Sequence, residues 1–157
     1  MPGLEDLYRE IILDHYRNPR NRGELETPPA LRVEGFNPLC GDEIVLYLDF
    51  DANGGVADIR ISGQGCSISQ SSGSMMSAAV KGKSVAEIDE LTRAFKAMMS
   101  IHENTLEGAE TAEPIDAPDV KLGDLEALRG VVKFPVRIKC ATLAWNTLAQ
   151  GIEEASA

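Results

Sequence analysis

The stretch EIVLYLDFDANGGVADIRIS, residues 43–62, decides the fold of this chain. Each half of it alternates apolar and polar residues, as a strand with one buried face does. The apolar positions are Ile44, Leu46, Leu48 and Phe50 in the first half and Ala57, Ile59 and Ile61 in the second. Asn53 and Gly54 stand between the halves, and this pair is a strong hairpin signal. The stretch therefore predicts two antiparallel strands that bury one face.

The flanking sequence extends this pattern on both sides. LRVEGF, residues 31–36, also alternates, so residues 31–63 are predicted to form a three-stranded antiparallel meander. Helical spacing of apolar residues predicts helices over residues 4–17, 67–80 and 85–99, and a last helix from about Ile138. We therefore expect an α+β fold, in which helices pack on one face of a three-stranded antiparallel sheet.

Length and composition bound the organisation of the chain. With 157 residues, 43% of them hydrophobic, the chain is long enough to bury a core as one domain spanning residues 1–157. Residues 102–120 are acidic, contain two prolines and show little periodicity. That segment is predicted to be a loop insertion.

The charge excludes some classes of partner. A formal net charge of -10 argues against nucleic acid and against an anionic membrane surface, and it favours a partner with a basic surface. The sequence has neither a long apolar run nor the basic and apolar regions of a signal peptide. We therefore expect a cytoplasmic protein.

Chemistry is most plausible at the cysteines, of which there are three, an odd number that disfavours a disulfide framework. Cys40 and Asp42 flank Gly41, and residues two apart in an extended segment point to the same side. Both could then reach one metal ion. The alternative is a small buried cysteine beside a turn-forming aspartate.

The other two cysteines could join this pair. Cys66 opens a predicted helix, whose N-terminus favours a thiolate, and it follows the strand that pairs with the one after Cys40. Cys140 begins or nearly begins the last helix, with the cations Arg137 and Lys139 close by. If the three meet, Cys40, Asp42, Cys66 and Cys140 form a four-coordinate set suited to zinc. The alternative leaves one or more thiols inert in the core, because spacing alone does not prove that Cys140 converges.

Other residues favour structural interpretations. His15 lies on the apolar side of the first helix, where a hydrogen-bonded core or boundary residue is commoner than a metal ligand. Met75, Met76, Met98 and Met99 fit helix faces and are expected to pack in the core.

Four segments together resemble the SufU/IscU family of iron-sulfur cluster assembly proteins. They are YREIILDHYRNPRNRG (residues 8–23), NPLCGDEI (37–44), SGQGCSIS (62–69) and FPVRIKCATLAW (134–145). The resemblance runs from about residue 7 to 152 and is closer to the zinc-binding SufU-like branch. IscU-like scaffolds usually carry a histidine before the third cysteine, where this chain has Lys139, and they lack the segment around 102–120.

The resemblance implies a function and a set of roles. Cys40, Asp42, Cys66 and Cys140 would bind zinc, and Cys40 would accept sulfane sulfur as a persulfide from a SufS-like cysteine desulfurase. The protein would stimulate that desulfurase as a sulfurtransferase-type carrier and pass sulfur to downstream SUF assembly proteins. Arg137 would orient Asp42 or a cysteine sulfur. Two alternatives remain, namely a scaffold that holds a transient 2Fe–2S cluster on the same residues and a structural zinc interaction module.

Overall fold

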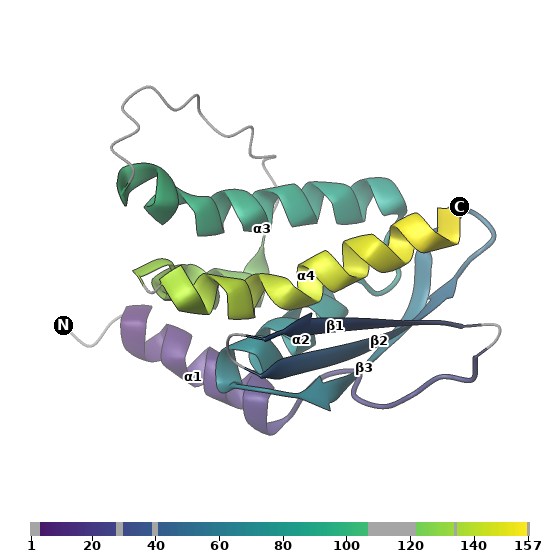
Figure 1. The fold of residues 1–157 in the computed structure, drawn as a ribbon, viewed down its shortest axis with the longest axis horizontal. Coiled ribbons are helices and arrows are strands. Elements are labelled where there is room, and N and C mark those ends of the chain that lie inside the picture. Colours follow the sequence, from purple (N-terminus) through teal and green to yellow (C-terminus); the bar gives the residue numbers. More distant parts are fainter. Residues whose placement is uncertain (1–3, 28–29, 39–40, 107–121, 134, 157) are drawn as a thin grey trace.

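The computed structural model describes residues 4–27, 30–38, 41–106, 122–133 and 135–156. In these ranges the order of elements is α1 (Leu4–Arg17), β1 (Leu31–Asn37), β2 (Asp42–Phe50), β3 (Val56–Gln64), α2 (Ser67–Val80), α3 (Val85–Leu106), the 3-10 helix η1 (Gly123–Lys133) and α4 (Pro135–Ser156). The predicted α+β architecture is confirmed (Figure 1). No helix in these ranges is long and apolar enough to cross a bilayer.

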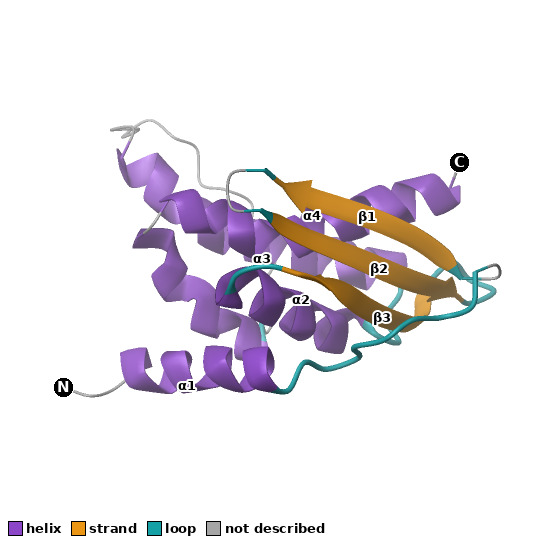
Figure 2. Cartoon of the chain, turned by 60° about the horizontal axis from the view of Figure 1, so that its bottom comes forward, coloured by secondary structure: helices purple, strands orange, loops and turns teal. Residues whose placement is uncertain are grey.

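The sheet is the predicted meander, with strand order β1-β2-β3 and antiparallel pairing throughout. Helices α2 and α4 cover one of its faces, and α3 lies over α4 on the side away from the sheet (Figures 1 and 2). The core lies between these layers, where Phe95 of α3 stacks on Trp145 of α4 with ring centroids 5.2 Å apart. The four methionines assigned to packing are all buried there.

One position in β3 was predicted on the wrong face. Ala57 is exposed, whereas Val56 is completely buried. The cause is a register shift at Asp49 and Phe50, which pairs Phe50 with Val56 and leaves Ala57 as an extra residue. A bulge of this kind breaks the alternation on which the prediction relied.

Three helix boundaries also differ from the prediction or add to it. Helix α3 continues to Leu106, so residues 102–106, which were assigned to the loop insertion, are helical. The rest of that predicted insertion lies outside the described residues, apart from the unpredicted η1 that follows it. Helix α4 begins at Pro135, three residues before the predicted start at Ile138.

Helix α4 lies unusually close to the sheet because of two glycines. A Cβ placed on Gly35 of β1 would overlap the hydroxyl of Thr147, and one on Gly151 would lie 2.7 Å from Leu48 Cδ1. Contacts this short require a neighbour to move. The glycines thus fix the distance between α4 and β1, and with it the position of α4 over the end of the sheet.

This close approach predicts the effect of one substitution. Gly35→Ala should destabilise the protein by about 1–3 kcal/mol, the usual cost of overpacking, as measured by urea unfolding. Because the overlap is mainly with Thr147 Oγ1, the double variant Gly35→Ala, Thr147→Ala should lose less than the sum of the two single variants. Additive losses would show that the hydroxyl does not limit the packing.

Candidate metal centre

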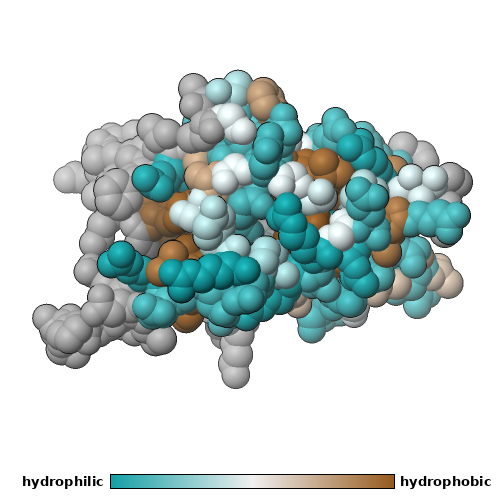
Figure 3. All heavy atoms as spheres, turned by 90° about the horizontal axis from the view of Figure 1, so that it is seen from below, coloured by the Kyte–Doolittle hydropathy of each residue, from teal (hydrophilic) through white to brown (hydrophobic). Residues whose placement is uncertain are grey.

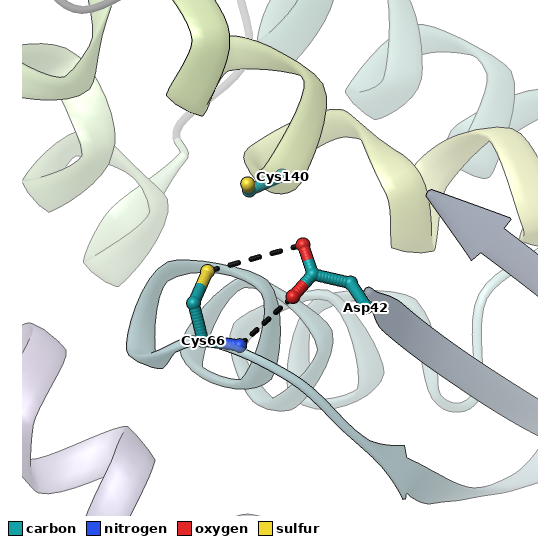
Figure 4. Close-up of side chains that lie close together, drawn as sticks. All are labelled: Asp42, Cys66 and Cys140. Carbon is teal, nitrogen blue, oxygen red and sulfur yellow. Dashed lines mark hydrogen bonds between the residues drawn. The ribbon is translucent and has the colours of Figure 1, made fainter. Parts of the chain in front are cut away.

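Three side chains from three different elements meet at one end of the sheet. Asp42 is the first residue of β2, Cys66 immediately precedes α2, and Cys140 lies in the second turn of α4. One carboxylate oxygen and the two sulfurs lie within 4.8 Å of one another. Figure 4 shows the carboxylate and both sulfurs pointing toward the same space. The convergence of Cys140 with the other segments, which spacing could not establish, is present.

Asp42 is held by the backbone that carries Cys66. Its side chain is fully buried, and Oδ1 accepts a hydrogen bond of 2.9 Å from the Cys66 amide. This leaves Oδ2 facing the Cys66 sulfur at 3.9 Å (Figure 4). Gly65 makes the arrangement possible, because a Cβ there would lie 2.5 Å from Asp42 Oδ1 and 2.6 Å from Ser69 Oγ. The carboxylate therefore has one oxygen fixed and one available to a ligand.

Cys66 is the N-cap residue of α2, as the sequence predicted for the start of a helix. Its backbone is extended, with φ -70° and ψ 168°, and its sulfur accepts a hydrogen bond of 3.4 Å from the Ser69 amide. The hydroxyl of Ser69 donates in turn to the Cys66 carbonyl at 3.1 Å. Unpaired amides at a helix N-terminus stabilise negative charge, so this position favours sulfur as an anionic ligand.

Cys140 occupies a different environment from the one expected. Since α4 begins at Pro135, Cys140 lies beyond the first turn, where the field of the helix terminus has largely fallen off. Instead, the Nδ2 group of buried Asn37 donates to the Cys140 sulfur at 3.8 Å. Nearby, the hydroxyl of Ser72 in α2 donates to the carbonyl of Ala141, which joins the two cysteine-bearing helices.

Asn37 is a site residue that sequence reasoning missed. In the sequence it was only part of a turn signal before Pro38. In the structure it ends β1 and pairs directly with Asp42 of β2. The signal that could have found it is its position across the β1–β2 connection from Asp42, since paired residues of neighbouring antiparallel strands share a face.

The remaining predicted site residues have mixed outcomes. Cys40 lies outside the described residues, so its approach to Cys66 stays a prediction. Arg137 is exposed, and it forms no hydrogen bond or ion pair with Asp42, Cys66 or Cys140. Lys139, at the position where scaffolds carry histidine, is exposed as well.

The three donors present fit a zinc ion in type and spacing. Tetrahedral zinc with Zn–S bonds near about 2.3 Å separates its sulfur ligands by roughly 3.8 Å. The observed separation of 3.9 Å between Cys66 Sγ and Asp42 Oδ2 is close to this value, and the 4.8 Å limit on the other pairs requires only small side-chain shifts. A cysteine pair with one carboxylate leaves one position of a four-coordinate site for another ligand.

His15 belongs to the core, as its position in the sequence favoured. It is 2% exposed, and its ring nitrogens lie 2.8 Å from Ser74 Oγ and 2.8 Å from Asp124 Oδ2. These contacts join α1 to α2 and η1. The interpretation of His15 as a hydrogen-bonded core residue is confirmed.

Comparison with known proteins identifies the family. Residues 7–141 match the model of the NifU-like N-terminal domain. The chain belongs to this family. The match covers all three segments of the candidate metal centre and confirms the resemblance to SufU/IscU proteins, a family of iron-sulfur cluster assembly scaffolds.

Relatives of this NifU-like domain have two kinds of name. The chain is 45% identical to the zinc-dependent sulfurtransferase SufU of Bacillus subtilis, over 95% of this chain and 91% of that protein. It is 39% identical to the iron-sulfur cluster assembly scaffold protein IscU of Streptococcus pyogenes, over 98% and 87%. Among solved structures, the N-terminal part of a nitrogen-fixing NifU-like protein from Brucella abortus has 26% identity and a TM-score of 0.74, with 98% of both chains covered.

The geometry predicts how metal binding by this NifU-like domain responds to loss of the carboxylate. Asp42→Ala should weaken Co²⁺ binding about 10- to 100-fold, because it removes a ligand and frees the Cys66 amide. The measurement is a titration of metal-free protein followed through the thiolate-to-cobalt absorption. Asp49→Ala, on the same strand at the far end from Asp42, is the matched control. Equal affinities of the two variants would remove Asp42 from the site.

Proposed function

We propose that this protein is a zinc-dependent sulfur acceptor in iron-sulfur cluster assembly, which takes persulfide sulfur from a cysteine desulfurase onto Cys40. The single observation that carries the proposal is the meeting of Asp42, Cys66 and Cys140 within 4.8 Å. Cys40, two residues before Asp42, is the nearest residue in sequence that could complete a four-coordinate set.

When bound, zinc would keep its cysteine ligands deprotonated and so supply a thiolate at neutral pH. Asp42, Cys66 and Cys140 would hold it as the fixed ligands, each steadied by a hydrogen bond on the page. These bonds are Cys66 N–H to Asp42, Ser69 N–H to the Cys66 sulfur, and Asn37 N–H to the Cys140 sulfur. Donors to a ligand fix its orientation, so these three residues are suited to stay in place.

Cys40 would carry out the transfer. Its thiolate attacks the terminal sulfur of the desulfurase persulfide, the S–S bond of that persulfide breaks, and the desulfurase cysteine leaves as a thiolate. A new S–S bond forms on Cys40, and nothing is oxidised or reduced overall. The tripeptide Cys40-Gly41-Asp42 thus combines an exchangeable sulfur with a fixed carboxylate, and the positive φ of 68° at Gly41 is one that glycine adopts without strain.

The partners follow from this role. The donor would be a SufS-like cysteine desulfurase and the acceptors downstream SUF assembly proteins, all in the cytoplasm. The net charge of -10 favours partner surfaces that are basic. The described face in Figure 3 is mainly hydrophilic with small, separate hydrophobic areas, which suits association that is transient. In this role the protein is a sulfurtransferase-type carrier.

The test measures zinc content and desulfurase turnover together. We expect one zinc per chain, faster cysteine turnover when the zinc protein is added, and one extra sulfur atom on the peptide that contains Cys40. Cys40→Ala should abolish both the stimulation and the added sulfur, because no thiolate is left to accept it. Asp58→Ala, a carboxylate variant in β3 away from the site, should behave as the wild type.

Two other results would contradict the proposal. A stable 2Fe–2S cluster on reconstituted zinc-free protein, without desulfurase stimulation by the zinc form, would favour the scaffold function. Cys40→Ala protein that is less stable but transfers sulfur unchanged would favour a structural zinc module.

Arg137 remains a candidate for the same reaction in a role that involves the partner. It lies one helical turn before Cys140 and is exposed, so its guanidinium is available to an incoming negatively charged group. Arg137→Ala should reduce desulfurase stimulation several-fold at unchanged zinc content. Lys139→Ala, which removes a neighbouring exposed charge, is the control, and equal effects of the two variants would assign the loss to charge alone.

A further inference from the structure

The loop before Cys66 has few side chains to hold it in place. It consists of Gly63, Gln64 and Gly65, and Gly63 has a φ of 116°, a conformation that favours glycine. A Cβ on Gly63 would overlap the Glu43 carbonyl, and one on Gly65 would overlap Asp42. Both positions therefore have to be glycine, although glycine is the residue with the greatest backbone freedom. Another group must restrain the loop if Cys66 is to keep its position.

Arg22 supplies this restraint from outside. Its NH2 group donates to the Gly63 carbonyl at 3.1 Å, and its NH1 group donates to Gln70 Oε1 at 3.2 Å. Gly63 lies three residues before Cys66, and Gln70 lies four residues after it, in the first turn of α2. One guanidinium thus spans the strand end and the helix start between which Cys66 is placed. Within the described ranges, no other side chain donates a hydrogen bond to a carbonyl of residues 63–65.

The backbone around Arg22 is itself fixed. Ile61 of β3 donates to the Asn21 carbonyl at 2.9 Å and accepts from the Gly23 amide at 3.0 Å, so that Arg22 forms a parallel bridge with Ile61. Asn21 adopts a left-handed conformation with φ 57°, and its side chain donates to Ser77 of α2 at 3.1 Å. Arg22 therefore starts beside β3 and reaches along it toward the loop.

We infer that Arg22 is a positioning residue for Cys66. It acts through the Gly63 carbonyl and the Gln70 side chain and has no contact with the metal donors. This assigns a role to the segment NPRNRG, residues 18–23, which the proposed function does not use. The inference rests on the proposed metal site only for its consequence, since the contacts of Arg22 restrain the loop whether or not metal binds.

The first experiment uses metal-free protein and therefore does not depend on the proposed function. The Cys66 amide donates to Asp42, so its hydrogen exchange reports whether the loop keeps its position. Arg22→Ala should speed exchange at Cys66 about three- to tenfold, as loss of a modest hydrogen-bond pair implies. Arg17→Ala, which removes the same charge from the end of α1, should have no effect there. Arg22→Lys should restore part of the protection, because an ammonium can still donate to one acceptor.

Gln70→Ala provides a second test through a different residue. It removes one acceptor of Arg22, so it should speed exchange in the wild type and add little in the Arg22→Ala background. Unchanged exchange at Cys66 in Arg22→Ala, or fully additive effects of the two variants, would overturn the inference. If Arg22→Ala does not fold, the Gln70→Ala and Arg22→Lys variants still decide between these outcomes.

The second experiment tests the consequence for the site. Arg22→Ala should weaken Co²⁺ binding about tenfold and shift the thiolate-to-cobalt absorption, as loss of a group that supports a metal ligand does. Arg17→Ala should leave both unchanged. A wild-type protein that binds no metal would contradict the proposed function, and the exchange rates would still decide the role of Arg22. Altered exchange with unchanged metal binding would overturn the positioning role and leave the proposed function intact.

Discussion

The hydrogen bond from the Cys66 amide to Asp42 is the interaction on which the rest of the site depends. It joins the first residue of β2 to the residue that starts α2, at 2.9 Å and out of contact with water. A buried carboxylate is costly unless its oxygens are satisfied. The amide satisfies one oxygen and leaves the other turned toward the two sulfurs, so the bond that stabilises Asp42 also orients it. The glycine at position 65 is required because any side chain there would occupy this space.

The sequence allowed the sheet and the first two helices to be predicted because they follow from local patterns. Alternation in residues 43–62 marks the buried face of two strands, and the Asn53-Gly54 turn fixes their direction. From the pairing of these strands it follows that Asp42 and Cys66 lie at the same end of the sheet. That part of the site was therefore predictable without knowledge of how the helices pack. The alternation failed only at Ala57, where a bulge depends on the shape of the whole hairpin.

The contribution of α4 could not be predicted in the same way. Cys140 is separated from Cys66 by 74 residues, and no local pattern states which face of α4 meets the sheet or at what distance. That distance is set by Gly35, Thr147 and Gly151, whose close packing appears only in three dimensions. Asn37 was missed for a related reason. Its donor role toward Cys140 exists only after α4 has docked over the end of the β1–β2 pair.

Helix α2 shows how polar packing adds directional control to this arrangement. Its buried face carries serines, which weaken a helix when they lack partners outside it. Here Ser72 bonds to α4 beside Cys140, while Ser74 and Ser77 bond to the chain around Arg20. An apolar face would allow α2 to slide against its neighbours, whereas these hydrogen bonds fix its rotation and translation. The helix that carries Cys66 at its start is thereby held relative to Cys140 on one side and to the segment of Arg22 on the other, which explains how a loop rich in glycine can present a sulfur in a defined place.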